Sequence, residues 1–165
     1  MEIFFKEFTK EFLPLYFKWC EKEHVKEIWF RPGYAPPEAI ISKVEGNGFE
    51  HPFIIVIDDR EVGYINYYNR AKFAPPEPLC DDPNSVMGFD LFIGEEDYLG
   101  KGYGTEVVKK FSDKLFAPEG VKKIILDPFV DNKRAIRCYE KAGFSFSRYT
   151  KDSLGTEIYI MEKRK

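Results

Sequence analysis

Three glycines at alternate positions, Gly100, Gly102 and Gly104, stand directly before a stretch whose apolar residues recur at helical spacing. Glycine loses more conformational entropy on folding than any other residue, so a cluster of three implies that bare backbone is needed there. Backbone N–H groups at a helix start bind anions, and the helix dipole favours negative charge at that end. Lys101 adds a positive charge beside them. The stretch predicts a pyrophosphate-binding loop, with a tight strand-to-helix turn that binds nothing as the alternative.

The glycine spacing excludes two common phosphate-binding loops. A P-loop has four residues between its glycines and then Lys followed by Ser or Thr. Here Lys101 is followed by Gly102, and the glycine before Gly100 is Gly94. A dinucleotide-binding fingerprint reads G-x-G-x-x-G, whereas this loop reads G-x-G-x-G. The loop therefore belongs to neither class.

Hydrophobic patterning predicts a mixed α/β chain. We expect strands over 3–8, 53–57, 62–68, 87–93, 121–127, 144–150 and 156–162. We expect helices from about Thr9 to Lys22, over 24–30, over 38–46, over 105–116, and after a cap at Asp131 or Asn132 as far as Gly143. Four prolines argue against regular structure across 70–86. The strand–loop–helix–strand–helix order of the second half implies parallel pairing within a mixed sheet.

Composition limits the class of protein. A chain of 165 residues is expected to form one domain, and a net charge of −3 gives no reason to expect nucleic-acid binding. No apolar run reaches the length of a membrane span, and the first residues lack the features of a signal peptide. Cys20, Cys80 and Cys138 are therefore expected to be reduced thiols of a cytoplasmic protein. His24 and His51 lie in no metal-ligand cluster, so no metal is expected.

Two segments carry a resemblance to a known family: "GFDLFIGEEDYLGKGYGTEVVKKF" and "ILDPFVDNKRAIRCYEKAGF". They resemble the GNAT superfamily of N-acetyltransferases, and within it the aminoglycoside 6′-N-acetyltransferases. The resemblance implies one domain over 1–165 with a mixed, mostly antiparallel sheet of six to seven strands flanked by helices. It also implies that the fourth and fifth strands splay apart and that acetyl-CoA is the co-substrate. Leu99 departs from the family pattern, which has Arg or Gln at this position.

The resemblance assigns the cofactor to backbone of the fourth strand, to the glycine loop and to the start of a later helix. The residues implied are Leu91, Phe92, Ile93, Leu99, Gly100, Lys101, Gly102, Tyr103, Gly104, Thr105, Asn132 and Ala135. Asp90 corresponds to a general base, and Tyr139 to the acid that protonates the departing CoA sulfur. The alternatives are a solvated edge-strand aspartate for Asp90, core packing for Tyr139 and a simple helix cap for Asn132.

The resemblance also implies an acidic cleft that binds the acceptor. Asp127 matches a residue that faces the acceptor in the aminoglycoside enzymes, although Asp-Pro at a strand end is also typical of a turn. Glu77, Asp81 and Asp82 would add negative charge that attracts a polycation. Trp29, Tyr67 and Tyr68 would supply flat surfaces for sugar rings, with solvated acids and core aromatics as the alternatives.

These observations lead to one preferred function. We expect acetyl transfer to a primary amine of a small cationic acceptor, an aminoglycoside 6′-amine, by direct attack in a ternary complex. Acylation of a hydroxylysine-type amine in siderophore assembly is a second hypothesis. A non-catalytic CoA-binding protein is a third, which the presence of both Asp90 and Tyr139 disfavours. No nucleic-acid or membrane partner is expected, and the chain is expected to be a monomer or a homodimer.

Overall fold

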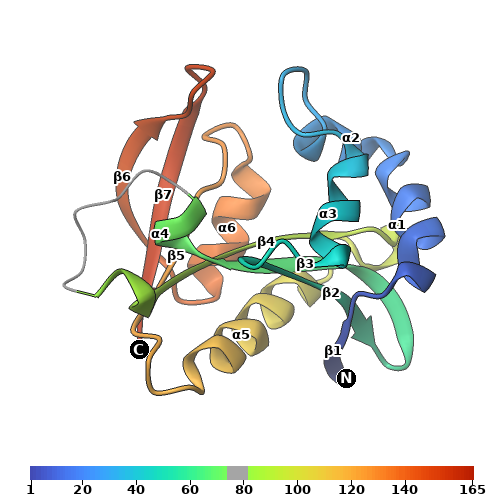
Figure 1. The fold of residues 1–165 in the computed structure, drawn as a ribbon, viewed down its shortest axis with the longest axis horizontal. Coiled ribbons are helices and arrows are strands. Elements are labelled where there is room, and N and C mark those ends of the chain that lie inside the picture. Colours follow the sequence, from blue (N-terminus) through green and yellow to red (C-terminus); the bar gives the residue numbers. More distant parts are fainter. Residues whose placement is uncertain (74–81) are drawn as a thin grey trace. The chain divides into compact units, whose positions relative to one another are not determined.

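The structure, a computed structural model, describes residues 1–73 and 82–165 (Figure 1). The strands are β1 (Ile3–Glu7), β2 (Glu50–Ile57), β3 (Arg60–Asn69), β4 (Val86–Ile93), β5 (Lys123–Leu126), β6 (Ser145–Lys151) and β7 (Glu157–Arg164). The α-helices are α1 (Leu13–Cys20), α2 (Glu23–Trp29), α3 (Ile40–Glu45), α4 (Arg70–Phe73), α5 (Tyr103–Phe116) and α6 (Lys133–Lys141). Short 3-10 turns cover Lys10–Phe12, Pro37–Ala39, Pro83–Ser85 and Glu96–Tyr98.

The strands form one sheet in the order β1-β2-β3-β4-β5-β7-β6. β1 and β2 pair antiparallel, as do β5 with β7 and β6 with β7. β4 and β5 are parallel, and in the described part of the chain their register comprises Val86 with Lys123 and Met87 with Ile124. The mixed, mostly antiparallel sheet and the short pairing of its fourth and fifth strands confirm the expected fold class.

The chain divides into two compact units, each described by itself. Unit 1 is residues 1–67 with 90–101, and unit 2 is residues 68–89 with 102–165. The single domain expected from the length stays a prediction. Unit 1 contains the α1, α2 and α3 helices, and unit 2 contains α5 and α6.

Unit 1 is built around an aromatic core between its helices and one face of β2, β3 and β4. Buried residues of this core are Phe8, Tyr16, Trp19, Cys20, Val25, Ile40, Ile54, Val56, Tyr64 and Phe92. Pro14 occupies the first turn of α1, where its missing N–H leaves no helical bond unmade, so the helix begins late rather than kinking. Asp58 and Asp59 take φ of 47° and 65° in the two-residue turn between β2 and β3, as a type I′ hairpin requires.

Unit 2 packs α5 and α6 around aromatic and branched side chains. The Phe89 ring contacts the rings of Phe111 on α5 and Phe144 after α6, at centroid distances of 5.3 and 6.3 Å. Gly143 follows α6 with φ of 92°, which is the left-handed helix cap that the sequence predicts. The closing hairpin of β6 and β7 is confirmed as well.

One sequence expectation about the 70–86 stretch was wrong. Residues 70–73 form the short helix α4, and 83–85 form a 3-10 turn in which Asp82 Oδ1 accepts a hydrogen bond from the Asn84 N–H at 2.9 Å. The prolines that argue against regular structure lie after α4, at 75, 76 and 78, and at the first position of the turn, where proline is tolerated.

Candidate functional site

The glycine loop has the backbone conformation that requires glycine. Gly100 and Gly102 have φ of 72° and 86°, and Gly102 caps α5 in the left-handed conformation. A β-carbon built at either position would meet no atom within 4 Å. The backbone on this side of the loop is therefore accessible to a ligand. The loop therefore fits a bulky anion at the start of α5, where N–H groups lack intrahelical acceptors. Lys101 is exposed between the two glycines.

α5 begins at Tyr103, two residues earlier than the sequence predicts. Gly104 therefore lies in the first helical turn, and a β-carbon there would contact Cys138 Sγ at an ordinary 3.6 Å. The Thr105 N–H already donates a hydrogen bond to Gly102 O at 3.1 Å. The N–H groups available to bind an anion are therefore those of the residues before Thr105. Leu99 is half-buried, and its N–H closes the preceding turn on Glu96 O.

The expected cofactor strand, Leu91 to Ile93, forms the end of β4 in unit 1. Phe92 is buried in the aromatic core, while Leu91 is half-buried. His24 Nε2 lies 2.9 Å from Ile93 O, so that nitrogen carries the proton and donates to the carbonyl. One backbone group expected to face the cofactor is therefore occupied by a side chain from α2. Sequence reasoning missed this role of His24, because the two residues are 69 positions apart.

Asp90 lies on β4 and is half-buried. Burial raises the pKa of Tyr64 well above its ordinary value, and the charges of Tyr16 and Asp90 raise it further. Among the described residues, the Tyr64 hydroxyl is buried without a hydrogen-bond partner. The Tyr64 phenol therefore stays neutral, and the charge of Asp90 contributes to that.

In unit 2, the candidate residues lie on α6. Asn132 Oδ1 accepts a hydrogen bond from the Ala135 N–H at 3.2 Å, so Asn132 caps the helix. A helix cap was one of the two roles predicted for Asn132, the other being a contact with the cofactor. Tyr139 is buried, with its ring centroid 6.2 Å from that of Phe144. Thr105 Oγ1 donates to Cys138 Sγ at 3.7 Å and links the first turn of α5 to α6 within this unit.

The three aromatic residues expected at the acceptor are largely packed. The Trp29 ring contacts those of Tyr64 and Phe92 at 5.9 and 5.1 Å in unit 1. Tyr67 is half-buried and stacks on His51 at 4.6 Å. Tyr68, in unit 2, is fully buried, and a β-carbon at Gly88 would lie 2.7 Å from its ring. Tyr68 therefore presents no surface to a sugar ring in this structure.

The acidic residues expected at the acceptor differ in their surroundings. Glu77 and Asp81 lie outside the described residues. Asp82 is exposed and caps the turn before β4. Asp127 is paired with the Arg70 guanidinium at 2.8 Å, both in unit 2, so its charge is locally neutralised. The sequence predicts the carboxylates but not this cation.

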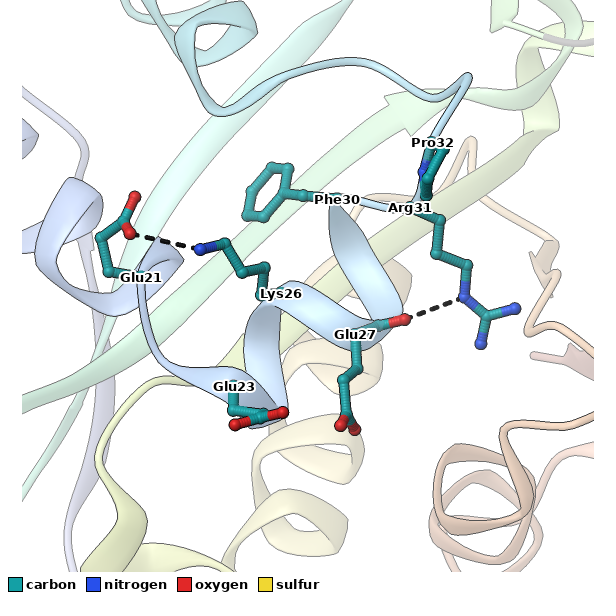
Figure 2. A pocket seen from close by; sticks show the side chains of 7 residues that line it. All are labelled: Glu21, Glu23, Lys26, Glu27, Phe30, Arg31 and Pro32. Atoms are coloured by element: carbon teal, nitrogen blue, oxygen red, sulfur yellow. Dashed lines mark hydrogen bonds and ion pairs between the residues drawn. The ribbon is translucent and has the colours of Figure 1, made fainter.

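A surface hollow of about 380 Å³ lies at α2 in unit 1 (Figure 2). It is lined by Glu21, Glu23, Lys26, Glu27, Phe30, Arg31 and Pro32. Its charges are mixed and partly satisfied within the hollow. Lys26 Nζ donates to Glu21 at 3.3 Å, and Arg31 Nε donates to Glu27 O at 3.0 Å.

Cys20 and Cys138 are free thiols, as expected, while Cys80 lies outside the described residues. Burial raises the pKa of Cys20 to about 12 and also raises that of Cys138, so neither is a reactive thiolate. Over residues 1–73 and 82–165, no group of three or more His, Cys, Asp or Glu side chains is arranged to hold a metal ion. Within the same residues, no helix has the length and apolarity needed to cross a membrane.

Comparison with known proteins gives a family match over most of the chain. The model of the acetyltransferase (GNAT) domain matches residues 9–151. The aminoglycoside N(6′)-acetyltransferase type 1 of Klebsiella pneumoniae is 30% identical over 161 residues, which cover 94% of this chain and 80% of that protein. The spermine/spermidine N(1)-acetyltransferase of Bacillus subtilis is 36% identical over 87 residues, covering 53% of this chain and 57% of that one.

A solved structure shows the same fold at full length. The aminoglycoside acetyltransferase AAC(6′)-Ib, in complex with paromomycin and acetyl-CoA, superposes with a TM-score of 0.87. It is 27% identical, and the match covers 100% of this chain and 94% of that one. The likeness therefore extends through both units.

Proposed function

Because the chain belongs to the GNAT acetyltransferase family, we propose that it transfers an acetyl group from acetyl-CoA to a primary amine of a small cationic acceptor, an aminoglycoside at its 6′-amine. The observation that carries the proposal is the open, left-handed backbone at Gly100 and Gly102, directly before α5. That geometry suits the pyrophosphate of CoA, and the similarity to AAC(6′)-Ib with acetyl-CoA supports it.

The distribution of charge supports both substrates. Unit 1 contains 16 Asp and Glu residues against 9 Lys and Arg, so its formal net charge is −7 and suits a polycationic acceptor. Residues 102–165 of unit 2 contain 14 Lys and Arg against 9 Asp and Glu, which suits the phosphates of CoA. The small net charge of the whole chain conceals this separation.

Asp90 is proposed as the general base. An ammonium acceptor has no lone pair for attack, so a carboxylate must first take a proton, directly or through a water molecule. Asp90 stands half-buried on β4, where its charge helps to keep the Tyr64 phenol neutral. This partly apolar position strengthens the attraction between the carboxylate and an ammonium group.

Tyr139 is proposed as the general acid. Acetyl-CoA supplies the acetyl group as a thioester, and a thiolate leaves when the amine attacks. A phenol with a pKa of roughly 10 keeps its proton at neutral pH and can donate it to a thiolate whose free pKa is roughly 8.5. The buried position of Tyr139 on α6 holds its ring in one place.

Acceptor identity is proposed from similarity. The relative from Klebsiella pneumoniae favours an aminoglycoside. The partial match to the Bacillus subtilis spermine/spermidine enzyme favours a linear polyamine as a second candidate. Both are polycations, and the acidic unit 1 suits either.

A CoA-thiol release assay tests these proposals. Purified protein with acetyl-CoA is offered kanamycin, spermidine, spermine and N6-hydroxylysine at equal concentrations. We expect the largest kcat/KM with kanamycin and a product acetylated at the 6′-amine by NMR. Preference for spermidine would select the polyamine reading, and preference for hydroxylysine the siderophore reading. Acetyl-CoA binding without turnover of any amine would support a non-catalytic protein.

A further inference from the structure

The Glu95 carboxylate is a meeting point of three side chains in unit 1. The Trp19 indole N–H donates to Glu95 Oε1 at 2.8 Å, and the other carboxylate oxygen lies 3.1 Å from Arg60 Nη2 and 3.6 Å from Lys22 Nζ. Glu95 is only 16% exposed, so these contacts are shielded from solvent more than ordinary surface pairs. We call these four residues the Glu95 cluster.

Arg60 extends the cluster along the following turn. Its Nη1 lies 3.6 Å from Asp97 Oδ2, and its guanidinium carbon lies 5.5 Å from the centre of the Tyr98 ring. One arginine at the start of β3 thus contacts three residues of the segment that leads into the glycine loop. A planar guanidinium can satisfy carboxylates and an aromatic face together, whereas a lysine ammonium cannot do so with the same geometry.

The backbone before the turn is fixed as well. The N–H groups of Gly94 and Glu95 both donate hydrogen bonds to Val62 O, at 2.8 and 3.1 Å. These two bonds to one carbonyl follow the end of β4 and hold the chain against β3. Trp19 packs so closely on Gly94 that a β-carbon there would lie 2.2 Å from its ring. The same tryptophan therefore contacts Gly94 through its ring and Glu95 through its N–H.

These contacts all converge on residues 94–98, and the pyrophosphate loop begins at Leu99. We propose that Glu95 and Arg60 are positioning residues for acetyl-CoA, because they fix the place where the glycine loop leaves β4. This inference rests on the proposed function. Neither side chain is assigned to contact a substrate; both act through the backbone of the loop.

A positioning role of this kind predicts a specific kinetic pattern. When the cluster is weakened, the loop samples more conformations, and binding of acetyl-CoA must first select the competent one. The affinity for acetyl-CoA then falls, while turnover by the bound complex is retained. A merely structural role would lower thermal stability without this selective loss.

Glu95→Gln and Arg60→Gln test the inference. The glutamine amide in Glu95→Gln would keep an oxygen for the Trp19 N–H but lose the charge that holds Arg60 and Lys22. We expect each variant to raise the Kd of acetyl-CoA, measured by calorimetric titration, about three- to tenfold, the effect of one partly shielded charge pair. The double variant should raise the Kd by less than the product of the two single effects, because the Glu95–Arg60 pair is lost in both single variants.

Glu61→Gln is the matched control. It makes the same chemical change at the residue after Arg60 and breaks the Lys6–Glu61 pair at 2.8 Å, which does not involve residues 94–98. Its Kd for acetyl-CoA should equal that of the wild type. With an amine that the wild type acetylates, kcat and the acceptor KM should stay within about twofold in Glu95→Gln and Arg60→Gln, since only the cofactor step is affected.

The outcomes separate the two proposals. A wild-type protein that binds no acetyl-CoA would refute the proposed function itself. Wild-type binding together with unchanged affinity in both folded variants, or an equal loss in Glu61→Gln, would overturn only the positioning role. Because Arg60 is half-exposed, Arg60→Gln remains informative even if Glu95→Gln does not fold. Faster amide exchange over 96–101 in the variants without cofactor would support the role directly, and unchanged exchange would contradict it.

Discussion

Arg70 Nη1 donates to Asp127 Oδ2 at 2.8 Å, and the arginine is 6% exposed while the aspartate is 31% exposed. This pair gives Asp127 a structural role beside any contact with the acceptor. Asp127→Asn would leave the buried guanidinium with a weaker partner. We expect the free energy of unfolding to fall by about 1–3 kcal/mol in urea titrations.

A double variant separates the two roles of Asp127. Arg70→Met combined with Asp127→Asn removes both charges and should recover most of the lost stability. If Asp127 also binds the acceptor amine, the acceptor KM of the double variant stays raised despite that recovery. Full stability in Asp127→Asn alone would show that the ion pair contributes little.

Local patterns predicted much of the fold. Short apolar runs on either side of the Asp58-Asp59 turn marked β2 and β3, and the cap at Asn132 with Gly143 marked both ends of α6. Strand ends were less accurate: β2 begins at Glu50, three residues before the apolar run that predicted it. Glu50 is held by Asn47, Lys43 and Asn66, and a hydrophobic pattern does not report such polar pairing.

Contacts between residues far apart in the chain could not be predicted from the sequence. The Trp19–Glu95 hydrogen bond joins residues 76 positions apart, and Lys123, which is 1% exposed, reaches Glu162 across 39 positions. Nothing near Lys123 in the sequence distinguishes it from its exposed neighbour Lys122. Such pairs depend on which strands become neighbours in the sheet. The sequence could therefore indicate candidate site residues, but not the residues that they contact.

Gly102→Ala tests the bare-backbone interpretation of the loop. Gly102 caps α5 with φ of 86°, and the new β-carbon would meet no atom of the protein within 4 Å. We expect a slightly lower melting temperature, because alanine is strained in the left-handed conformation, and a Kd for acetyl-CoA raised about tenfold or more, because the β-carbon occupies the open side of the loop that the pyrophosphate would approach.

Gly155→Ala is the control for that change. Gly155 also has a positive φ, of 80°, a β-carbon there meets nothing within 4 Å, and the residue lies outside the glycine loop. Its melting temperature should fall to a similar extent, and its affinity for acetyl-CoA should match that of the wild type. Equal affinities in Gly102→Ala, Gly155→Ala and the wild type would mean that the loop is only a strand-to-helix turn.

Asp90→Asn keeps the shape of the side chain on β4 but cannot accept a proton. We expect kcat to fall about 10²–10⁴-fold at neutral pH, the usual contribution of a positioned base. The deficit should shrink as pH rises, since more of the acceptor amine is then already neutral. The measurement is a pH series of CoA-thiol release for both proteins. A deficit that is constant with pH would argue against a base at Asp90.

Tyr139→Phe removes the proposed acid and keeps the ring against Phe144. We expect kcat to fall about 10²–10⁴-fold with no rescue at high pH, because the missing proton belongs to the leaving group. Tyr64→Phe is a control for the effect on stability, because it removes a hydroxyl that is buried without a hydrogen-bond partner among the described residues. Its stability should be unchanged or higher. Similar kcat values for Tyr139→Phe and the wild type would assign Tyr139 to the core.

The pH dependence of stability gives an independent measure of the Glu95 cluster. Burial disfavours the charged carboxylate, but the Trp19 hydrogen bond and the Lys22 and Arg60 charges outweigh it and lower the pKa of Glu95. A carboxyl whose pKa is lower in the folded state stabilises the protein above its unfolded pKa, roughly 4.3, and this stabilisation is lost as pH falls through the folded pKa.

We therefore expect wild type and Glu95→Gln to differ in unfolding free energy by about 1 kcal/mol from neutral pH down to about pH 5. The difference should narrow as the pH falls below the ordinary value for glutamate. Glu61→Gln should behave similarly, because the Lys6 hydrogen bond lowers the pKa of Glu61, yet it should leave acetyl-CoA affinity unchanged. A stability difference for Glu95→Gln that is the same at about pH 3 and pH 7 would show that the charge of Glu95 does not hold the cluster together.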